Sequence, residues 1–376
     1  MRRTSPFAAV CGLFLFSAGT YALLQAVLPL LRTVWGLSYG QLMVVEVAYF
    51  AVLVISAGLL SRWVQAIPYP RNLGLAASAA AVGSACIGLA AVSGLWVLLL
   101  FGCAVLGVGS AGIQVIGNAL VTGLEPVRLR ASRFTLAQAF SALGMLLALA
   151  VTWGVLSLVG DPQRALQALF ISLTLIWCLC ALGCFRLAGM AAVPSQQTPL
   201  GTIWRSRRAW IALTVLAAYV GVEVALAMLV VPVMQLESGE AIAWSVLYWL
   251  GLMVGRFLGA GYLRRFGAGR VVALHAIAGV ACIALSSIWP ALILVTGLCN
   301  SVIYPAVYAI AIDQTNDSSQ GLAGFLLLSS LGGAVLPLIA GVTIDFAGVG
   351  LALLWPLLGY LALVLFGLRG PAPLKN

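Results

Sequence analysis

The chain has 376 residues, of which 63% are apolar and only 7% are charged. Soluble chains carry roughly 25% charged residues, so this composition and a mean hydropathy of +1.13 exclude a soluble protein and indicate an integral membrane protein. There are 19 Lys and Arg residues against 9 Asp and Glu. With so few cations, we expect their positions to report membrane orientation rather than nucleic-acid binding.

Twelve apolar segments follow one another along the chain. A bilayer core of about 30 Å needs about 20 apolar residues per helix, and the segments between charged, Pro/Gly and Ser/Asn clusters have that length. The first follows Met1-Arg2-Arg3 and is predicted as a membrane helix rather than a signal peptide, because further apolar segments come after it. The predicted spans are 8–31, 41–61, 73–93, 95–123, 134–158, 165–186, 210–234, 242–262, 271–288, 290–312, 321–343 and 350–368.

One connection stands out by its length and polarity. Residues 187–209 contain Pro194, Pro199 and three arginines, whereas most other connections are short. This segment is predicted as a linker that divides the chain into a six-helix bundle at 1–186 and a second six-helix bundle at 210–376.

The distribution of cations predicts orientation. With the N-terminus inside the cell, sixteen of the 19 Lys and Arg residues lie on the cytoplasmic side, and only Arg32 and Arg164 lie on the other side. Cytoplasmic loops of membrane proteins are enriched in Lys and Arg. We therefore expect a multi-pass protein of the cell (inner) membrane with both termini in the cytoplasm.

The two halves show weak internal similarity. The sequence of Ala139–Gly144 parallels that of Leu327–Gly332, and Tyr21–Gln25 parallels Tyr219–Glu223. Two parallel six-helix repeats around a site at the membrane midplane are a common transporter layout. We therefore predict an all-α membrane fold with two six-helix pseudo-repeats.

Three charged side chains lie clearly inside predicted spans. Glu46 and Glu223 could each take up and release a proton during transport, or could stay neutral and donate one hydrogen bond between helices, because a charge at this depth is costly. Arg256 keeps its charge, and two roles are open for it: a gating ion pair, or extension of the side chain to the membrane surface.

Neutral polar residues recur at helical spacing on several spans. Carboxamides and aromatic rings suit the binding of a hydroxyl-rich ligand. The alternative role for these residues is hydrogen bonding between helices. Their occurrence on five spans favours a shared binding cavity. The candidate residues are Tyr21, Gln25, Gln114, Asn118, Gln138, Tyr219, Asn300 and Tyr304, together with Glu223.

Cysteine and histidine usage predicts neither a metal site nor a cofactor. All eight cysteines lie in apolar runs and are interpreted as small packing residues. The single histidine, His275, belongs to no His/Cys cluster, which argues against a metal centre and against a Ser-His-Asp triad. We expect no catalytic residues.

Several segments resemble one known family. The helix patterns at 134–144, 219–225 and 253–257, with Tyr304-Pro305 and Gly332-Gly333, are similar to those of the fucose–proton symporter family, which includes bacterial glucose/galactose transporters and belongs to the major facilitator superfamily. The resemblance implies the major facilitator fold, alternating access, and a sugar or similar polar solute.

The chain departs from that family at the positions linked to proton coupling. Family members carry an Asp four residues before a Pro in helix 1 and a Glu four residues before an Asn in helix 4. Counting back from Pro29 and Asn118, this chain has Gln25 and Gln114, and the Asn of the helix-5 motif is replaced by Ser141. Glutamine cannot titrate, so proton symport does not carry over directly.

Several functions therefore remain open. The leading prediction is a monomeric transporter of a small polar solute, in which Glu223 or Glu46 has taken over proton coupling, or in which transport is uncoupled. The alternative is an exporter of amphiphilic molecules such as drugs, siderophores or metabolites. A membrane-embedded enzyme or receptor would need a catalytic cluster, metal ligands or a soluble module, and the sequence offers none of these.

Overall fold

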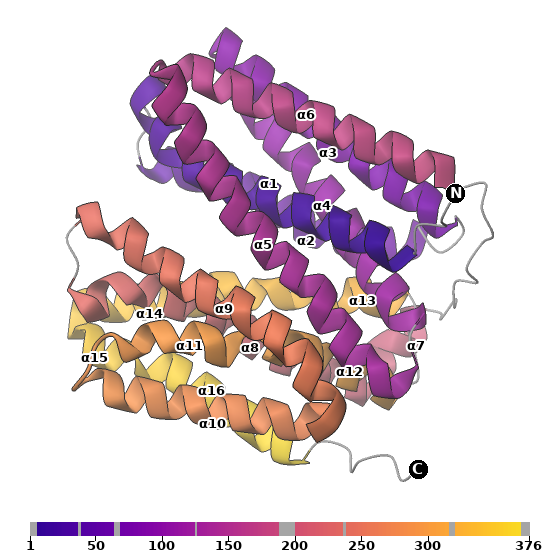
Figure 1. The fold of residues 1–376 in the computed structure, drawn as a ribbon, viewed down its shortest axis with the longest axis vertical. Coiled ribbons are helices and arrows are strands. Elements are labelled where there is room, and N and C mark those ends of the chain that lie inside the picture. Colours follow the sequence, from indigo (N-terminus) through magenta and orange to yellow (C-terminus); the bar gives the residue numbers. More distant parts are fainter. Residues whose placement is uncertain are drawn as a thin grey trace. The chain divides into compact units, whose positions relative to one another are not determined.

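The computed structural model describes residues 6–36, 39–63, 68–124, 126–187, 200–235, 238–315 and 320–369 (Figure 1). These residues are almost entirely helical and contain no strand. The helices are α1 (Pro6–Trp35), α2 (Tyr39–Trp63), α3 (Tyr69–Ser93), α4 (Trp96–Leu124), α5 (Val127–Val159), α6 (Pro162–Leu187), α7 (Leu200–Arg205), α8 (Arg207–Met234), α9 (Ser238–Phe266), α10 (Ala268–Ser286), α11 (Leu292–Asn300), α12 (Ile303–Thr315), α13 (Gln320–Leu327), the 3₁₀ turn η2 (Leu328–Leu331), α14 (Gly332–Ala347), α15 (Val349–Ala352) and α16 (Leu354–Arg369).

The helices follow the predicted spans in order. Among the described residues, eleven helical stretches are long and apolar enough to cross a membrane, and α2 adds a shorter apolar stretch, Ala48–Leu59. The predicted fold class is therefore confirmed. The largest difference at a helix start is in α5, which begins at Val127, seven residues before the predicted start at 134, because its first turns carry arginines that the hydropathy criterion placed outside the membrane.

Three spans consist of shorter helices joined end to end. Leu292–Thr315 contains α11 and α12, Gly321–Ile344 contains α13, η2 and most of α14, and Val349–Arg369 contains α15 and α16. Pro305 and Pro356, the third residues of α12 and α16, lack the backbone N–H that would bond four residues back across two of these breaks, whereas Pro337 lies inside α14. Such breaks persist in a membrane protein only where other groups satisfy the freed carbonyls.

The chain forms two compact units. The first comprises the described residues of Met1–Leu120, Leu143–Gln197 and Ser319–Phe325, and the second those of Val121–Ala142, Thr198–Ser318 and Leu326–Asn376. Helix α5 contributes its first half to the second unit and its second half to the first. The division into six-helix bundles at 187–209 stays a prediction.

Glycine-mediated helix contacts repeat inside the two units. In the first unit, a Cβ added at Gly144 would overlap the carbonyl oxygen of Leu15. In the second unit, a Cβ added at Gly332 would overlap the carbonyl oxygen of Ala217. Helices can approach this closely only where small residues meet. The predicted correspondence between Ala139–Gly144 and Leu327–Gly332 thus has a counterpart in packing.

The same contacts correct the register predicted for the first helix of each half. A Cβ at Gly19 would lie 2.9 Å from the Gly144 oxygen, and a Cβ at Gly221 would lie 3.0 Å from the Gly332 oxygen. Gly19 therefore corresponds to Gly221, which places Tyr21 at the position of Glu223. The predicted pairing of Tyr21 with Tyr219 differs by one helical turn, because short motifs in apolar helices recur by chance.

Candidate polar site at a helix break

The span Leu292–Thr315 is interrupted inside the second unit. Helix α11 ends at Asn300 and α12 begins at Ile303. Pro305 has no N–H to donate to the carbonyl of Ser301, four residues earlier. The break therefore exposes backbone oxygens in an apolar environment, where each needs another donor.

Side chains from three other helices bind three consecutive carbonyls at the break. Arg256 Nε of α9 donates to the Ser301 oxygen at 3.2 Å, and the Tyr219 hydroxyl of α8 donates to the Asn300 oxygen at 2.9 Å. His275 Nδ1 of α10 lies 2.8 Å from the Cys299 oxygen. The backbone oxygens at the break are therefore hydrogen-bonded rather than left unsatisfied.

The partners of His275 define its hydrogen-bonding state. The Cys299 carbonyl can only accept, so Nδ1 carries a hydrogen. Nε2, 2.6 Å from the Tyr262 hydroxyl, then accepts from that phenol when the imidazole is neutral. His275 serves here as a hydrogen-bond link between α9, α10 and α11. Among the described side chains, no three His, Cys, Asp or Glu residues gather closely enough to ligate a metal ion.

The side chain of Asn300 joins the cluster to two more tyrosines. Its Nδ2 donates to the Tyr248 hydroxyl and its Oδ1 accepts from the Tyr360 hydroxyl, each at 2.8 Å, and Tyr248 in turn donates to the backbone oxygen of Glu223 at 2.8 Å. Asn300, Tyr248 and Tyr360 are fully buried. In this conformation Asn300 therefore ties α11 to α9 and α16, and a role in binding solute stays a prediction.

Arg256 and Glu223 form a buried ion pair. Arg256 Nη2 lies 3.8 Å from Glu223 Oε1, and the two side chains are 8% and 14% exposed. Arg256 Nη1 also donates to the backbone oxygen of Gln138 at 3.1 Å. This is not the geometry of an arginine extended to the membrane surface. A gating role for Arg256 stays a prediction.

Aromatic rings line the same region. Tyr304 is half-buried and lies against Phe134, Tyr219 and Tyr308, with ring centroids 6.1–6.2 Å apart. Tyr219 lies one turn before Glu223 on α8. The structure thus brings Tyr219, Glu223, Tyr304 and the backbone of Gln138 together around the break.

The other predicted residues belong to the first unit. Tyr21 is half-buried and stacks on Tyr49 with ring centroids 5.4 Å apart. Gln114 is half-buried and Asn118 is fully buried, both on α4. The side chains of Gln25 and Glu46 lie outside the described part of the chain. That all the candidates line one cavity stays a prediction.

Sequence reasoning missed several members of the polar cluster. Tyr248 and Tyr360 each place a phenol in the middle of a predicted span, but their spacing paired them with no other polar residue.

Two serines form a separate feature. Ser141 and Ser329 hold buried hydroxyls with no hydrogen-bond partner among the described residues. They occupy the same position in the two repeated motifs.

A second polar cluster lies at the end of the same span. Asp313 of α12 forms an ion pair with Arg130 of α5, and Arg130 Nε donates to the Thr122 oxygen at 2.8 Å. Arg208 Nη1 donates to the Gln314 oxygen at 2.7 Å. These bonds anchor the end of α12 to α5 and α8 within the second unit.

The chain matches one protein family over most of its length. Residues 9–295 match the profile of the Major Facilitator Superfamily. A glucose/galactose transporter of Brucella abortus biovar 1 (strain 9-941) is 29% identical over 367 residues, covering 91% of this chain and 88% of that protein.

Solved structures extend the comparison. FucP in the outward conformation matches with a TM-score of 0.85 at 19% identity, covering 98% of this chain and 99% of FucP. Another structure of FucP, the E. coli fucose:proton symporter, matches over the same shares with a TM-score of 0.81 at 20% identity. The resemblance predicted from the helix motifs is confirmed by these matches.

Proposed function

Because the chain belongs to the major facilitator superfamily, we propose that it carries a sugar-sized polar solute across the membrane by alternating access. The Brucella relative is named a glucose/galactose transporter, and FucP is a fucose:proton symporter. Hexoses are therefore the first solutes to test. The proposal includes no catalytic step, since the solute crosses the membrane unchanged.

The observation that carries this proposal is the polar cluster at the break between α11 and α12. Tyr219, Glu223, Tyr304 and Arg256 place phenols, a carboxyl and a guanidinium beside backbone that is not closed into a helix. Broken helices near the midplane are where many transporters bind their solutes, and hydroxyl-rich solutes need paired donors, acceptors and aromatic faces.

The remaining candidate residues are proposed as further solute contacts. Gln114 and Asn118 of α4, with Tyr21 and Gln25 of α1, offer carboxamide and phenol groups on the first helices of the chain. Each can be tested singly by replacement with Ala. Loss of a contact to the solute should lower the affinity of the protein for that solute, but exchange should persist when the solute is supplied in excess.

Proton coupling is proposed to run through Glu223, with Glu46 as the second candidate. Arg256 stays positive, so ionised Glu223 makes the pair neutral, whereas protonated Glu223 leaves one net positive charge in an apolar region. Protonation therefore changes the electrostatic energy of the cluster, which is what coupling requires. Gln25 and Gln114 cannot contribute such a change.

Solute counterflow tests the transport proposal. Purified protein in liposomes preloaded with glucose, galactose or fucose should exchange at least one of these labelled sugars, and unlabelled competitors should suppress the signal. Protein-free liposomes and labelled sorbitol serve as controls. Absence of exchange with every hexose, together with transport of an amphiphilic dye, would contradict the sugar proposal and favour an exporter.

Orientation and oligomeric state are part of the proposal. Both termini are proposed to lie in the cytoplasm, on the basis of the arginine distribution, and the functional unit is proposed to be a monomer built from two six-helix halves. Reporter fusions at the C-terminus, fluorescent only in the cytoplasm or active only in the periplasm, test the orientation. A periplasmic readout would overturn it.

A further inference from the structure

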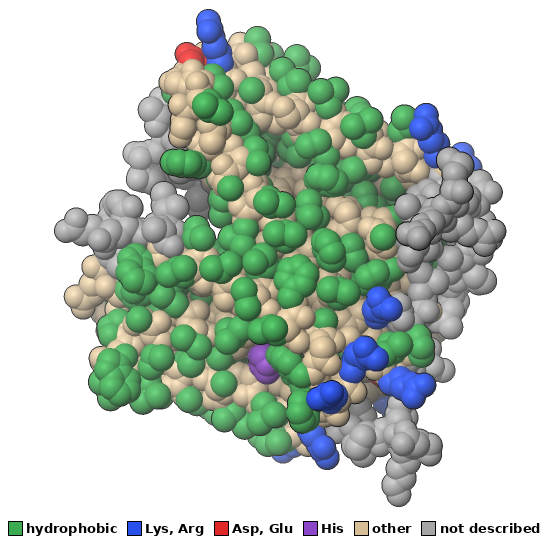
Figure 2. Space-filling model, viewed as in Figure 1, with side chains coloured by type: hydrophobic (Ala, Val, Ile, Leu, Met, Phe, Trp, Pro, Cys, Tyr) green, Lys and Arg blue, Asp and Glu red, His purple; other side chains and the backbone are tan. Residues whose placement is uncertain are grey.

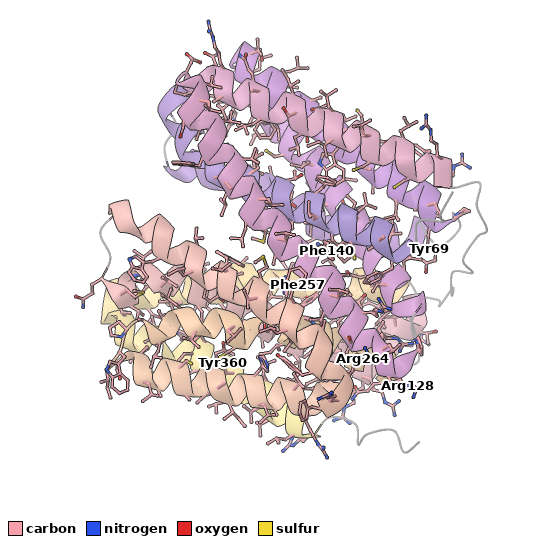
Figure 3. All side chains as sticks on the ribbon, in the orientation of Figure 1. Tyr69, Arg128, Phe140, Phe257, Arg264 and Tyr360 are labelled. Carbon is pink, nitrogen blue, oxygen red and sulfur yellow. The ribbon has the colours of Figure 1, made fainter. Side chains whose placement is uncertain are left out.

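A cavity opens where the beginning of α5 meets the end of α9, inside the second unit. It has a volume of about 830 Å³, and its lining includes Arg128, Leu129, Tyr262, Arg264, Arg265 and Phe266. Figure 3 labels Arg128 and Arg264 at these two helix ends. Farther along the same helices, Phe140 and Phe257 pack edge to face with ring centroids 6.0 Å apart.

The cavity is cationic. Arg128, Arg264 and Arg265 are exposed. Among the described residues, no carboxylate lines the cavity and none of the three arginines forms an ion pair. Arg130, two residues from Arg128, is paired with Asp313 instead. Orientation in the membrane explains cations at span ends, but it does not require three guanidinium groups around one cavity.

The cavity lies at the depth of lipid headgroups. The helices that carry Arg128 and Phe266, α5 and α9, begin and end beside the cavity, and arginines at the ends of membrane helices are typical of the membrane surface. Phe266 is 56% exposed, and Tyr262 also lines the cavity. Aromatic side chains are typical of this interface.

An exposed apolar track leads along α9 to the cavity. Val254 and Leu258 are 40% and 62% exposed. Leu258 lies seven residues before Arg265 and therefore on the same helix face. Figure 2 shows several Lys and Arg side chains close together beside apolar side chains at the surface. A free anion would use only the arginines, whereas a lipid would use both the arginines and the apolar track.

We propose that this cavity binds the phosphate of an anionic membrane lipid, with Arg128, Arg264 and Arg265 contacting the phosphate. Guanidinium groups bind phosphate oxygens in pairs, and basic pockets at membrane interfaces take lipid headgroups. The acyl chains lie along the exposed apolar residues of α9. Tyr262 and Phe266 pack against the glycerol region.

Native mass spectrometry of the purified full-length protein tests the proposal. Titration with phosphatidylglycerol should give a tightly bound lipid, and phosphatidylcholine should bind more weakly. At about fivefold per arginine, the double variant R264Q/R265Q should lose about 25-fold in affinity for phosphatidylglycerol. Arg128→Gln, on the other helix, should lose about fivefold by the same estimate.

Arg270→Gln is the matched control, because Arg270 is an exposed arginine near the same helix ends that does not line the cavity. It should bind phosphatidylglycerol as the wild type does. Equal losses in Arg270→Gln and Arg128→Gln, or no loss in Arg128→Gln, would overturn the proposal. Millimolar inorganic phosphate that displaces the lipid and itself raises the melting temperature as far as the lipid does would identify a free-anion site instead.

Discussion

At the scale of single residues, Arg256 connects the polar cluster. Its guanidinium group reaches the carbonyl of Ser301, the carbonyl of Gln138 and the carboxyl of Glu223. An unpaired charge in an apolar interior is costly, so removing one partner of such a pair destabilises more than replacing both. The cluster is therefore sensitive to the charge on Glu223 and to the presence of Arg256.

Arg256→Met should destabilise the protein by about 3–5 kcal/mol, because Glu223 loses its positive partner and the carbonyl oxygens of Ser301 and Gln138 lose their donor. Adding Glu223→Gln should restore part of this loss, since no unpaired carboxylate then remains. The melting temperatures of the two single variants and the double variant in detergent form a double-mutant cycle. Additive losses in this cycle would mean that the pair, at 3.8 Å, has no energetic coupling.

At the scale of elements, the break between α11 and α12 depends on Pro305. Without proline, an N–H at this position could bond to the Ser301 oxygen and extend α12 backwards. The oxygen already accepts from Arg256 Nε. The break thus exchanges a backbone hydrogen bond for a side-chain bond from another helix, and we propose that the span bends there during transport.

Pro305→Ala should raise stability by up to about 1 kcal/mol through the new hydrogen bond, while the transport rate falls because the span is stiffer. Melting temperature and sugar counterflow measure the two effects. Pro337→Ala, inside α14, is the control for proline replacement in a neighbouring span. Unchanged counterflow in Pro305→Ala would show that bending at this break is not needed for transport.

Close helix contacts at Gly144 and Gly332 give a prediction with controls on the same helices. Gly144→Ala and Gly332→Ala should each cost about 1–3 kcal/mol, because the added methyl overlaps a backbone oxygen of the facing helix. Gly154→Ala on α5 and Gly341→Ala on α14 meet nothing within 4 Å and should be neutral or stabilising by about 0.5–1 kcal/mol. The yield of monodisperse protein and its melting temperature are the readouts. Equal effects at all four positions would contradict the packing described.

At the scale of the whole molecule, the sequence was most informative about the spans. Their length, their apolar composition and signals such as Gly94 and Gly160, which adopt left-handed φ values of 70° and 69° after α3 and α5, are local properties. The helix breaks are also partly local, since Pro305 and Pro356 lie in the first turn of the helix that follows two of them.

Contacts between distant residues were less accessible to sequence reasoning. The links of Asn300 to Tyr248 and Tyr360 join positions 52 and 60 residues apart, and no spacing rule on one helix connects them. Nor did periodicity decide whether Arg256 extends to the membrane surface or pairs with Glu223. Those outcomes depend on how helices pack.

Our central proposal is that this protein is a sugar transporter in which Glu223 couples transport to protons. Its most direct test compares wild-type protein and Glu223→Gln in liposomes, using hexose accumulation driven by an imposed pH gradient and hexose counterflow without one. Glu46→Gln is run in parallel as the competing carrier. We predict that Glu223→Gln abolishes accumulation and retains counterflow, whereas accumulation by Glu223→Gln at the wild-type level would contradict the proposal.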